Sequence, residues 1–110
     1  MAQVSKPAMH PHDTYVEKFT ASADTDLSIY GLSINTSDAA GGGDTWSLPN
    51  GSYNGQRKAF FNDDDDVWTI TPSTQMGDPT TFSVPANGGL VAYWYDNGTD
   101  VGWFAGGEGS

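Results

Sequence analysis

The histidines and carboxylates are the side chains of this sequence whose types and spacing could do chemistry. The two histidines flank a proline in His10-Pro11-His12-Asp13. A structural zinc site takes four ligands, usually including cysteine or well-separated histidines, and the sequence contains no cysteine. A Ser-His-Asp triad would have to recruit one of these histidines, yet no Gly-x-Ser-x-Gly elbow is present. We therefore expect solvated histidines and no metal site.

A run of four aspartates, at positions 63–66, is the densest cluster of carboxylates. Calcium is the ion that such oxygen ligands suit, but the spacing of Asp, Gly and a distal Glu in an EF-hand is missing. Because adjacent carboxylates repel one another, the run is typical of a solvated hairpin loop between two strands. An exposed ion pair from this loop to Arg57 or Lys58 would contribute under about 1 kcal/mol. We predict a charged hairpin loop, with calcium as the alternative.

Other catalytic signatures are missing as well. Composition excludes cysteine chemistry. The glycine run 41–43 is not followed by the Gly-Lys-Ser/Thr of a phosphate-binding loop. Aspartate is so plentiful that any pair of carboxylates suited to glycoside hydrolysis is unspecific. The sequence predicts a protein that is not an enzyme and needs no cofactor.

The net charge excludes two classes of partner. Fourteen acidic residues against four basic ones give a formal net charge of −10. Nucleic-acid binding needs clustered cations that displace counterions from phosphate, and an anionic membrane surface attracts similar clusters. We therefore expect no nucleic acid and no membrane among the partners. The sequence shows no signal peptide and no apolar run long enough to span a membrane, which predicts synthesis in the cytoplasm.

The composition favours a small all-β domain. Fourteen glycines in 110 residues and few strong helix formers disfavour helices, while aromatic residues make up 13% of the chain. The apolar fraction of 36% is low, so the core must be small. A small sheet fold without disulfides is marginal by itself. This predicts association into an oligomer or docking on a larger body.

Alternating apolar residues and turn signals place the strands. This spacing is typical of a small antiparallel β-sandwich or barrel with an extended N-terminal arm. The predicted organisation is an arm over 1–24, a β domain over 25–107 with a flexible connector at 36–44, and a tail over 108–110. The expected strands cover 15–19 (as an edge strand), 25–35, 67–71, 80–84, 90–95 and 101–104.

Some positions within these strands carry a further expectation. Gly31, inside the second expected strand, indicates a bulge or a close approach of backbone. In the third strand Trp68 and Ile70 are expected on one face and Val67, Thr69 and Thr71 on the other, and in the fourth strand Phe82 and Val84 are expected to point inward.

The stretch 45–62 is the centre of the predicted arrangement. Two Asn-Gly dipeptides, Asn50-Gly51 and Asn54-Gly55, lie four residues apart between apolar segments. Both residue types tolerate positive φ, which makes Asn-Gly a strong turn signal. We expect two strands joined by a compact double turn, with Arg57 and Lys58 as paired cations at its exit.

The aromatic residues near the C-terminal end allow two interpretations. They could fill the core and the seams between subunits, or they could form a platform on which sugars stack. Strand alternation predicts that Tyr93 and Tyr95 face opposite to Trp94, so these rings cannot all lie in the core. We expect a subunit interface or a glycan platform formed by Tyr93, Trp94, Tyr95 and Trp103.

The segment 48–58, LPNGSYNGQRK, resembles a Leu-Pro-x-Gly-x-x-x-Gly-Gln-x-Lys module in structural proteins of tailed bacteriophages. The resemblance continues through the strand at 67–72, the Thr-Thr-Phe at 80–82 and a closing run at 91–104 with a Trp near its end. It covers roughly 45–107 and implies an all-β, often trimeric virion surface protein. Head decoration proteins, head fibres and tail fibres all contain such modules.

These observations predict a capsid decoration (cement) protein on the outer surface of the phage head. Its partners would be the major capsid protein and itself, as a homotrimer, and docking would stabilise the shell. Arg57 and Lys58 would orient the domain against acidic neighbours. The alternative is a head-fibre or tail-fibre module that recognises host surface glycans. The arm residues expected to bind the capsid are Val4, Lys6, Pro7, Met9, His10, Pro11, His12 and Tyr15.

Overall fold

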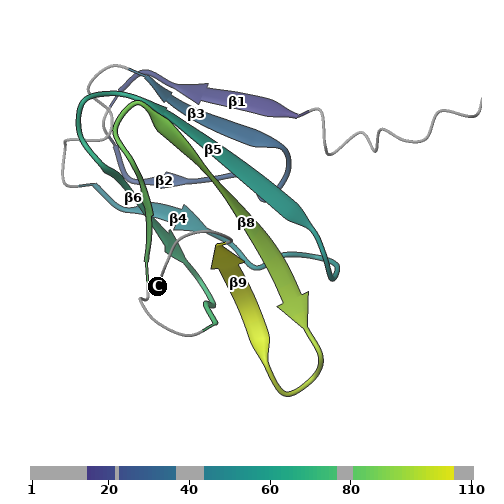
Figure 1. The fold of residues 1–110 in the computed structure, drawn as a ribbon. Coiled ribbons are helices and arrows are strands. Elements are labelled where there is room, and N and C mark those ends of the chain that lie inside the picture. The colour runs from purple at the N-terminus through teal and green to yellow at the C-terminus, as the bar shows by residue number, and fades with distance from the viewer. Residues whose placement is uncertain (1–14, 22, 37–43, 77–80, 106–110) are drawn as a thin grey trace, which may run out of the picture.

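The computed structural model describes residues 15–21, 23–36, 44–76 and 81–105. The predicted tail and almost all of the predicted connector lie outside the described residues, as does the arm up to residue 14. The described part of the chain is all-β, as predicted, and contains no helix. Figure 1 shows its strands in two layers. The strands are β1 (Val16–Phe19), β2 (Thr25–Asp26), β3 (Leu32–Thr36), β4 (Trp46–Leu48), β5 (Arg57–Asp63), β6 (Trp68–Pro72), β7 (Phe82–Val84), β8 (Gly88–Asp96) and β9 (Val101–Ala105).

The strands form a five-stranded sheet in the order β1-β3-β5-β8-β9 and a four-stranded sheet in the order β2-β4-β6-β7. Both sheets are mixed. The pairs β1/β3, β3/β5, β2/β4 and β4/β6 run parallel, whereas β5/β8, β8/β9 and β6/β7 run antiparallel. The predicted sandwich is confirmed, but its pairing is antiparallel only in the C-terminal half.

The parallel pairing follows from the path of the chain. From β1 to β6, successive strands alternate between the five-stranded and the four-stranded sheet. Each crossover therefore passes through a strand of the other sheet and returns in the original direction, which is what parallel neighbours require. Sequence patterns predict strands but contain no signal for this alternation.

Three predicted local connections differ from the structure for this reason. The segment 25–35 is not one strand: it divides into β2 and β3, and Gly31, with a φ of 67°, lies at the break. The stretch 45–62 is not a hairpin, because β4 and β5 belong to different sheets. The aspartates 63–66 likewise connect β5 to β6 across the sandwich, so they form a crossover and not a hairpin loop.

The start of the described chain also differs from the predicted arm. Residues 16–19 form β1, which lies at the edge of the five-stranded sheet and pairs with β3. The predicted edge strand is therefore confirmed. The predicted arm over 1–24 extends too far, because these residues are built into the sheet.

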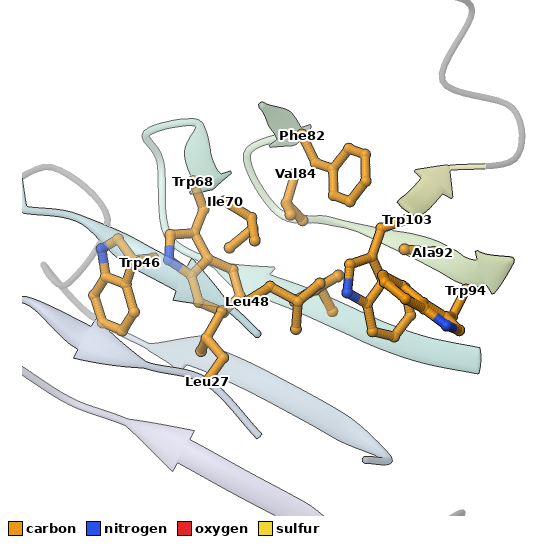
Figure 2. Close-up of a cluster of buried hydrophobic side chains, with 11 residues drawn as sticks. Leu27, Trp46, Leu48, Trp68, Ile70, Phe82, Val84, Ala92, Trp94 and Trp103 are labelled. Atoms are coloured by element: carbon orange, nitrogen blue, oxygen red, sulfur yellow. The ribbon is translucent and has the colours of Figure 1, made fainter. Parts of the chain in front are cut away.

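Four tryptophans dominate the space between the sheets (Figure 2). Trp46 packs edge-on against Trp68 at 5.4 Å between ring centroids, and Trp94 packs against Trp103 at 5.5 Å. The indole Nε1 of Trp103 donates a hydrogen bond of 2.8 Å to the Pro49 carbonyl. Phe82 and Val84 are buried, as predicted, and the face predicted to be shared by Trp68 and Ile70 is the buried face of β6.

The crossover between β4 and β5 closes the sandwich over Trp94. The Gly55 amide donates to the Trp94 carbonyl and the Trp94 amide donates to the Gln56 carbonyl, each at 2.9 Å. A Cβ on Gly51 would lie 2.3 Å from Cγ of Trp94, so only glycine fits there. Gly55 serves the turn instead, with a φ of 84° and open space around it. The two Asn-Gly dipeptides thus have different structural roles.

Candidate functional site

The inner face of the five-stranded sheet carries buried polar side chains beside the aromatic core. Lys58 points inward from β5 and is fully buried, with its Nζ donating a 2.9 Å hydrogen bond to the Tyr30 carbonyl. Its partner is Glu17 on β1, at 3.8 Å. The Glu17 Oε2 also accepts hydrogen bonds from the Ser28 amide at 2.8 Å and the Ser33 hydroxyl at 2.5 Å. Edge strand β1 is therefore fixed to the body by one carboxylate.

The charge on Lys58 is not fully compensated by these contacts. Burial lowers the pKa of Lys58 to about 8 from its ordinary value of 10.5, against the opposing attraction of Glu17. Glu17 remains partly exposed, which weakens its attraction for the ammonium group. This pair holds the sheet edge but costs desolvation energy.

An amide pair continues the polar row along the same face. The Asn35 Nδ2 donates to the Asn62 Oδ1 at 2.8 Å, and both side chains are fully buried. The Asn62 Nδ2 in turn donates to the Asp66 carbonyl at 2.7 Å. It also lies 3.3 Å from the carbonyls of Val84 and Pro85. These hydrogen bonds connect β3 and β5 to the neighbouring loops, so the inner polar groups are structural, although the buried Oδ1 of Asn35 has no hydrogen-bond partner.

The opposite surface of this sheet, which we call the outer face, has the reverse character. Strand alternation and the observed register place its residues in rows across the strands, for example Val16, Leu32, Ala59 and Val91. A second row contains Lys18, Ile34 and Phe61. The outer face comprises Val16, Lys18, Leu32, Ile34, Arg57, Ala59, Phe61, Val91, Tyr93, Tyr95 and Phe104.

Large apolar side chains on the outer face remain accessible to water. Val16 is 55% exposed, Phe61 40% and Phe104 41%. Five strands about 4.8 Å apart and about five residues deep give a face of about 400 Å². The largest apolar patch on a monomeric protein is typically of this order, and it is often functional. The outer face is therefore the candidate functional site.

One end of the outer face has a distinct surface. A shallow hollow there is lined by Tyr53, Gly55, Arg57 and Tyr93. The Tyr93 ring stacks on Phe104 with centroids 5.8 Å apart. Arg57 is exposed and forms no ion pair within the described ranges. A planar guanidinium between aromatic rings is suited to bind a carboxylate with two parallel hydrogen bonds.

The two cations that were predicted to orient the domain lie on opposite faces of the five-stranded sheet. Arg57 is exposed and available for an external contact, as its predicted role requires. Lys58 cannot have that role, because its side chain is fully buried and paired with Glu17. Consecutive residues of a strand point to opposite faces, so only one of two adjacent cations could be outside.

The four aromatic residues that were predicted to form one platform also divide between the two faces. Trp94 is 5% exposed and Trp103 is fully buried, so neither can form a subunit interface or stack on a glycan. Tyr93 and Tyr95 lie on the outer face, opposite to Trp94, which confirms the predicted alternation.

Of the predicted arm residues, only Tyr15 falls within the described part of the chain. It is 48% exposed, and its carbonyl accepts a 2.9 Å hydrogen bond from the Leu32 amide. The others lie outside the described residues: Val4, Lys6, Pro7, Met9, His10, Pro11 and His12.

Sequence reasoning missed most of the outer face. The apolar residues on both sides of the segment 90–95 were the one available signal, because they indicate a strand covered on both faces or placed at a contact. The contributions of Val16, Leu32, Ile34 and Phe61 could not be recognised, since they depend on which strands are neighbours.

Metal and membrane sites were also sought in the described ranges. No three residues among His, Cys, Asp and Glu come together there in a way that could hold a metal ion. The carboxylate Oδ1 of Asp64 accepts the Asp65 amide at 2.7 Å, which shapes the crossover locally. None of the described residues belongs to a helix long and apolar enough to cross a membrane.

Comparison with known proteins gives limited information. No protein-family model matches the sequence, and the search of curated proteins finds no match. Among solved structures, the chain is similar to the fragment StcE(132-251) of enterohemorrhagic E. coli, with 20% sequence identity and a TM-score of 0.42. The match covers 72% of this chain and spans 65% of that fragment.

Proposed function

We propose that this chain is a phage capsid decoration protein that docks through its outer face on the outer surface of the head. The observation that carries the proposal is the exposed apolar surface of the five-stranded sheet, in a chain with a formal net charge of −10. Accessible valine and phenylalanine side chains gain free energy when a partner surface removes them from water, at roughly 25 cal/mol per Å². The resemblance of 45–107 to phage structural modules supports the same assignment.

The size of the outer face suits a protein that acts in many copies. A stable interface between two proteins takes about 800 Å² from each partner, and the outer face offers about half of that. Each copy would bind weakly through this face alone, and the predicted N-terminal arm and a homotrimer would add contact and avidity. Docking across neighbouring capsid subunits would then stabilise the assembled shell by mass action.

Co-sedimentation with expanded heads of the encoding phage tests the proposal. The purified chain should pellet with heads and raise the temperature at which they dissociate. Phe61→Ser, which removes an exposed ring from the outer face, should weaken binding by about tenfold. The matched control is Val67→Ser, because Val67 is 52% exposed but lies outside the outer face. A wild-type chain that stays in the supernatant would refute the proposal.

Solution mass tests the predicted homotrimer separately. Light scattering of the purified chain should give three times the mass of one chain. A monomer that binds heads would leave docking in place and remove the trimer from the proposal.

A further inference from the structure

The accessible cations of the described chain lie together with its exposed apolar groups. The described residues include three cations, and Lys58 is buried. The other two, Lys18 on β1 and Arg57 on β5, are exposed and point to the outer face. Both exposed cations of the described residues therefore lie on the outer face, the side of the sheet that does not face the core. The full chain contains fourteen acidic residues.

The described carboxylates near this surface lie at the ends of its strands, with Asp63 ending β5 and Asp96 ending β8. Asp63, at the end of β5, alternates onto the outer face, and the neighbouring aspartates turn away into the crossover to β6. The other described aspartates lie outside the rows of apolar residues: Asp24, Asp26, Asp44 and Asp100. The outer face is therefore less acidic than the rest of the molecule.

The register fixes the spacing of the two cations. Lys18 lies in the row of Phe61, four residues along β5 from Arg57 and two strands away from it. With about 3.3 Å per residue and about 4.8 Å between strands, their Cα atoms are about 16 Å apart. The apolar row of Val16, Leu32 and Ala59 lies between them.

We infer that the partner surface is apolar at its centre and carries two carboxylates, one for Lys18 and one for Arg57, whose Cα atoms are about 16 Å apart. This inference rests on the proposed function, with the acidic surface belonging to the major capsid protein. At Arg57 the carboxylate would enter the hollow between Tyr53 and Tyr93 and accept two parallel hydrogen bonds. At Lys18 the contact is a point charge at the edge of the sheet. The two ion pairs fix the orientation of the domain, and the apolar centre supplies the affinity.

A second copy of this chain fits the outer face less well than such a partner. In a two-fold pairing, each outer face would offer its partner two cations and a single border carboxylate, Asp63. Half of the cationic groups would then face apolar or cationic side chains.

Charge reversal tests this inference in the head-binding assay. Arg57→Glu and Lys18→Glu should each weaken binding by tenfold or more, and the wild-type affinity should fall as salt is raised. Arg57→Lys should recover only part of the loss, because lysine cannot form the two parallel hydrogen bonds. The matched control is Thr69→Glu, which adds a negative charge at an exposed position of the other sheet and should bind like the wild type. The thermal midpoint of each variant checks that the fold is intact.

The outcomes separate the two proposals. If the wild type binds heads and both reversed variants bind equally well, decoration stands and the acidic partner surface is refuted. If the wild type does not bind heads at all, both proposals fall. If light scattering shows a dimer that Arg57→Glu abolishes, the outer face is the contact between two copies, and the inference is overturned.

Discussion

Each face of the five-stranded sheet departs in part from the usual distribution of side chains, although the inner face also carries core residues such as Phe60 and Trp94. The inner face buries a lysine and two asparagines, whereas the outer face exposes valine and phenylalanine. Burying a polar group costs free energy unless it is hydrogen-bonded, and exposing a large apolar group forgoes the gain from removing it from water. A chain selected only for stability would exchange the two sets.

The contacts within the chain explain the buried polar groups of the inner face. They do not explain the exposed apolar groups of the outer face. On the inner face, Lys58, Asn35 and Asn62 are held by hydrogen bonds that connect β1, β3 and β5 to the loops around them. On the outer face, Phe61 and Val16 remain 40% and 55% exposed. The inner face is thus complete within the single chain, and the outer face is what a partner would complete.

Neighbouring residues on opposite faces allow direct tests of this difference, and Trp103 and Phe104 should give the largest contrast. Trp103→Ala removes a fully buried indole and its hydrogen bond to Pro49, at a cost of about 3–5 kcal/mol in the free energy of unfolding. Phe104→Ala loses only the stacking on Tyr93, at about 1 kcal/mol. Urea unfolding of both variants measures the two costs. Similar losses for both would contradict the assignment of Phe104 to an open face.

Glu17 and Lys18 form the second neighbouring pair. Glu17→Ala leaves the ammonium group of Lys58 buried without its counter-charge, which should cost about 3 kcal/mol. The double variant Glu17→Leu/Lys58→Met should recover only part of this loss, because it removes the buried charge but takes away the hydrogen-bond partners of the Ser28 amide and the Tyr30 carbonyl. Lys18→Ala, on the outer face, should change stability by no more than about 0.5 kcal/mol. Chemical denaturation compares the three variants, and a double variant as unstable as Glu17→Ala would rule out this account.

Asn62 and Phe61 give the third contrast. Asn62→Ala breaks the buried hydrogen bonds to Asn35 and to the Asp66 carbonyl, at an expected cost of about 2 kcal/mol. Phe61→Ala removes a ring that is 40% exposed and should cost less than about 1 kcal/mol. Thermal unfolding of each variant shows which substitution lowers the stability more. If Phe61→Ala were the more harmful of the two, the outer face would be part of the stabilising core.

The inward residues of the later strands could be predicted from the sequence because their alternation is simple. Trp68 and Ile70 alternate with threonines, and Tyr93 and Tyr95 flank Trp94 in a continuous strand. Such local patterns depend only on the period of two along a strand. The hairpin between β8 and β9 was equally accessible, since the turn at 96–100 has Asn-Gly at its centre.

The pairing of the earlier strands and the direction of β5 could not be predicted in this way. Apolar and polar residues occur on both sides of β5, so alternation cannot decide whether Lys58 or Arg57 points inward. That choice depends on Glu17, forty-one residues earlier, which reaches Lys58 only because β1, β3 and β5 run parallel. The outer face could not be predicted from the sequence for the same reason, because its residues come from five separate segments.

The pH dependence of stability isolates the inner face, because it follows the titration of Lys58. The pKa of Lys58 is lowered to about 8 in the folded chain by burial and stays near 10.5 when the chain unfolds. Between these two values the unfolded chain binds more protons than the folded one, so the free energy of unfolding should increase with pH from about 8 to about 10. Below pH 8 both states hold the proton, and this contribution should be constant.

Subtracting the profile of Lys58→Met separates this contribution from that of all other groups, which both proteins share. The difference between wild type and variant should be flat below pH 8 and should rise above it. A difference that falls with increasing pH would mean that the folded chain holds the Lys58 proton more tightly than the unfolded chain. The ion pair with Glu17 would then outweigh desolvation, and the inner face would gain net stability from its buried charge.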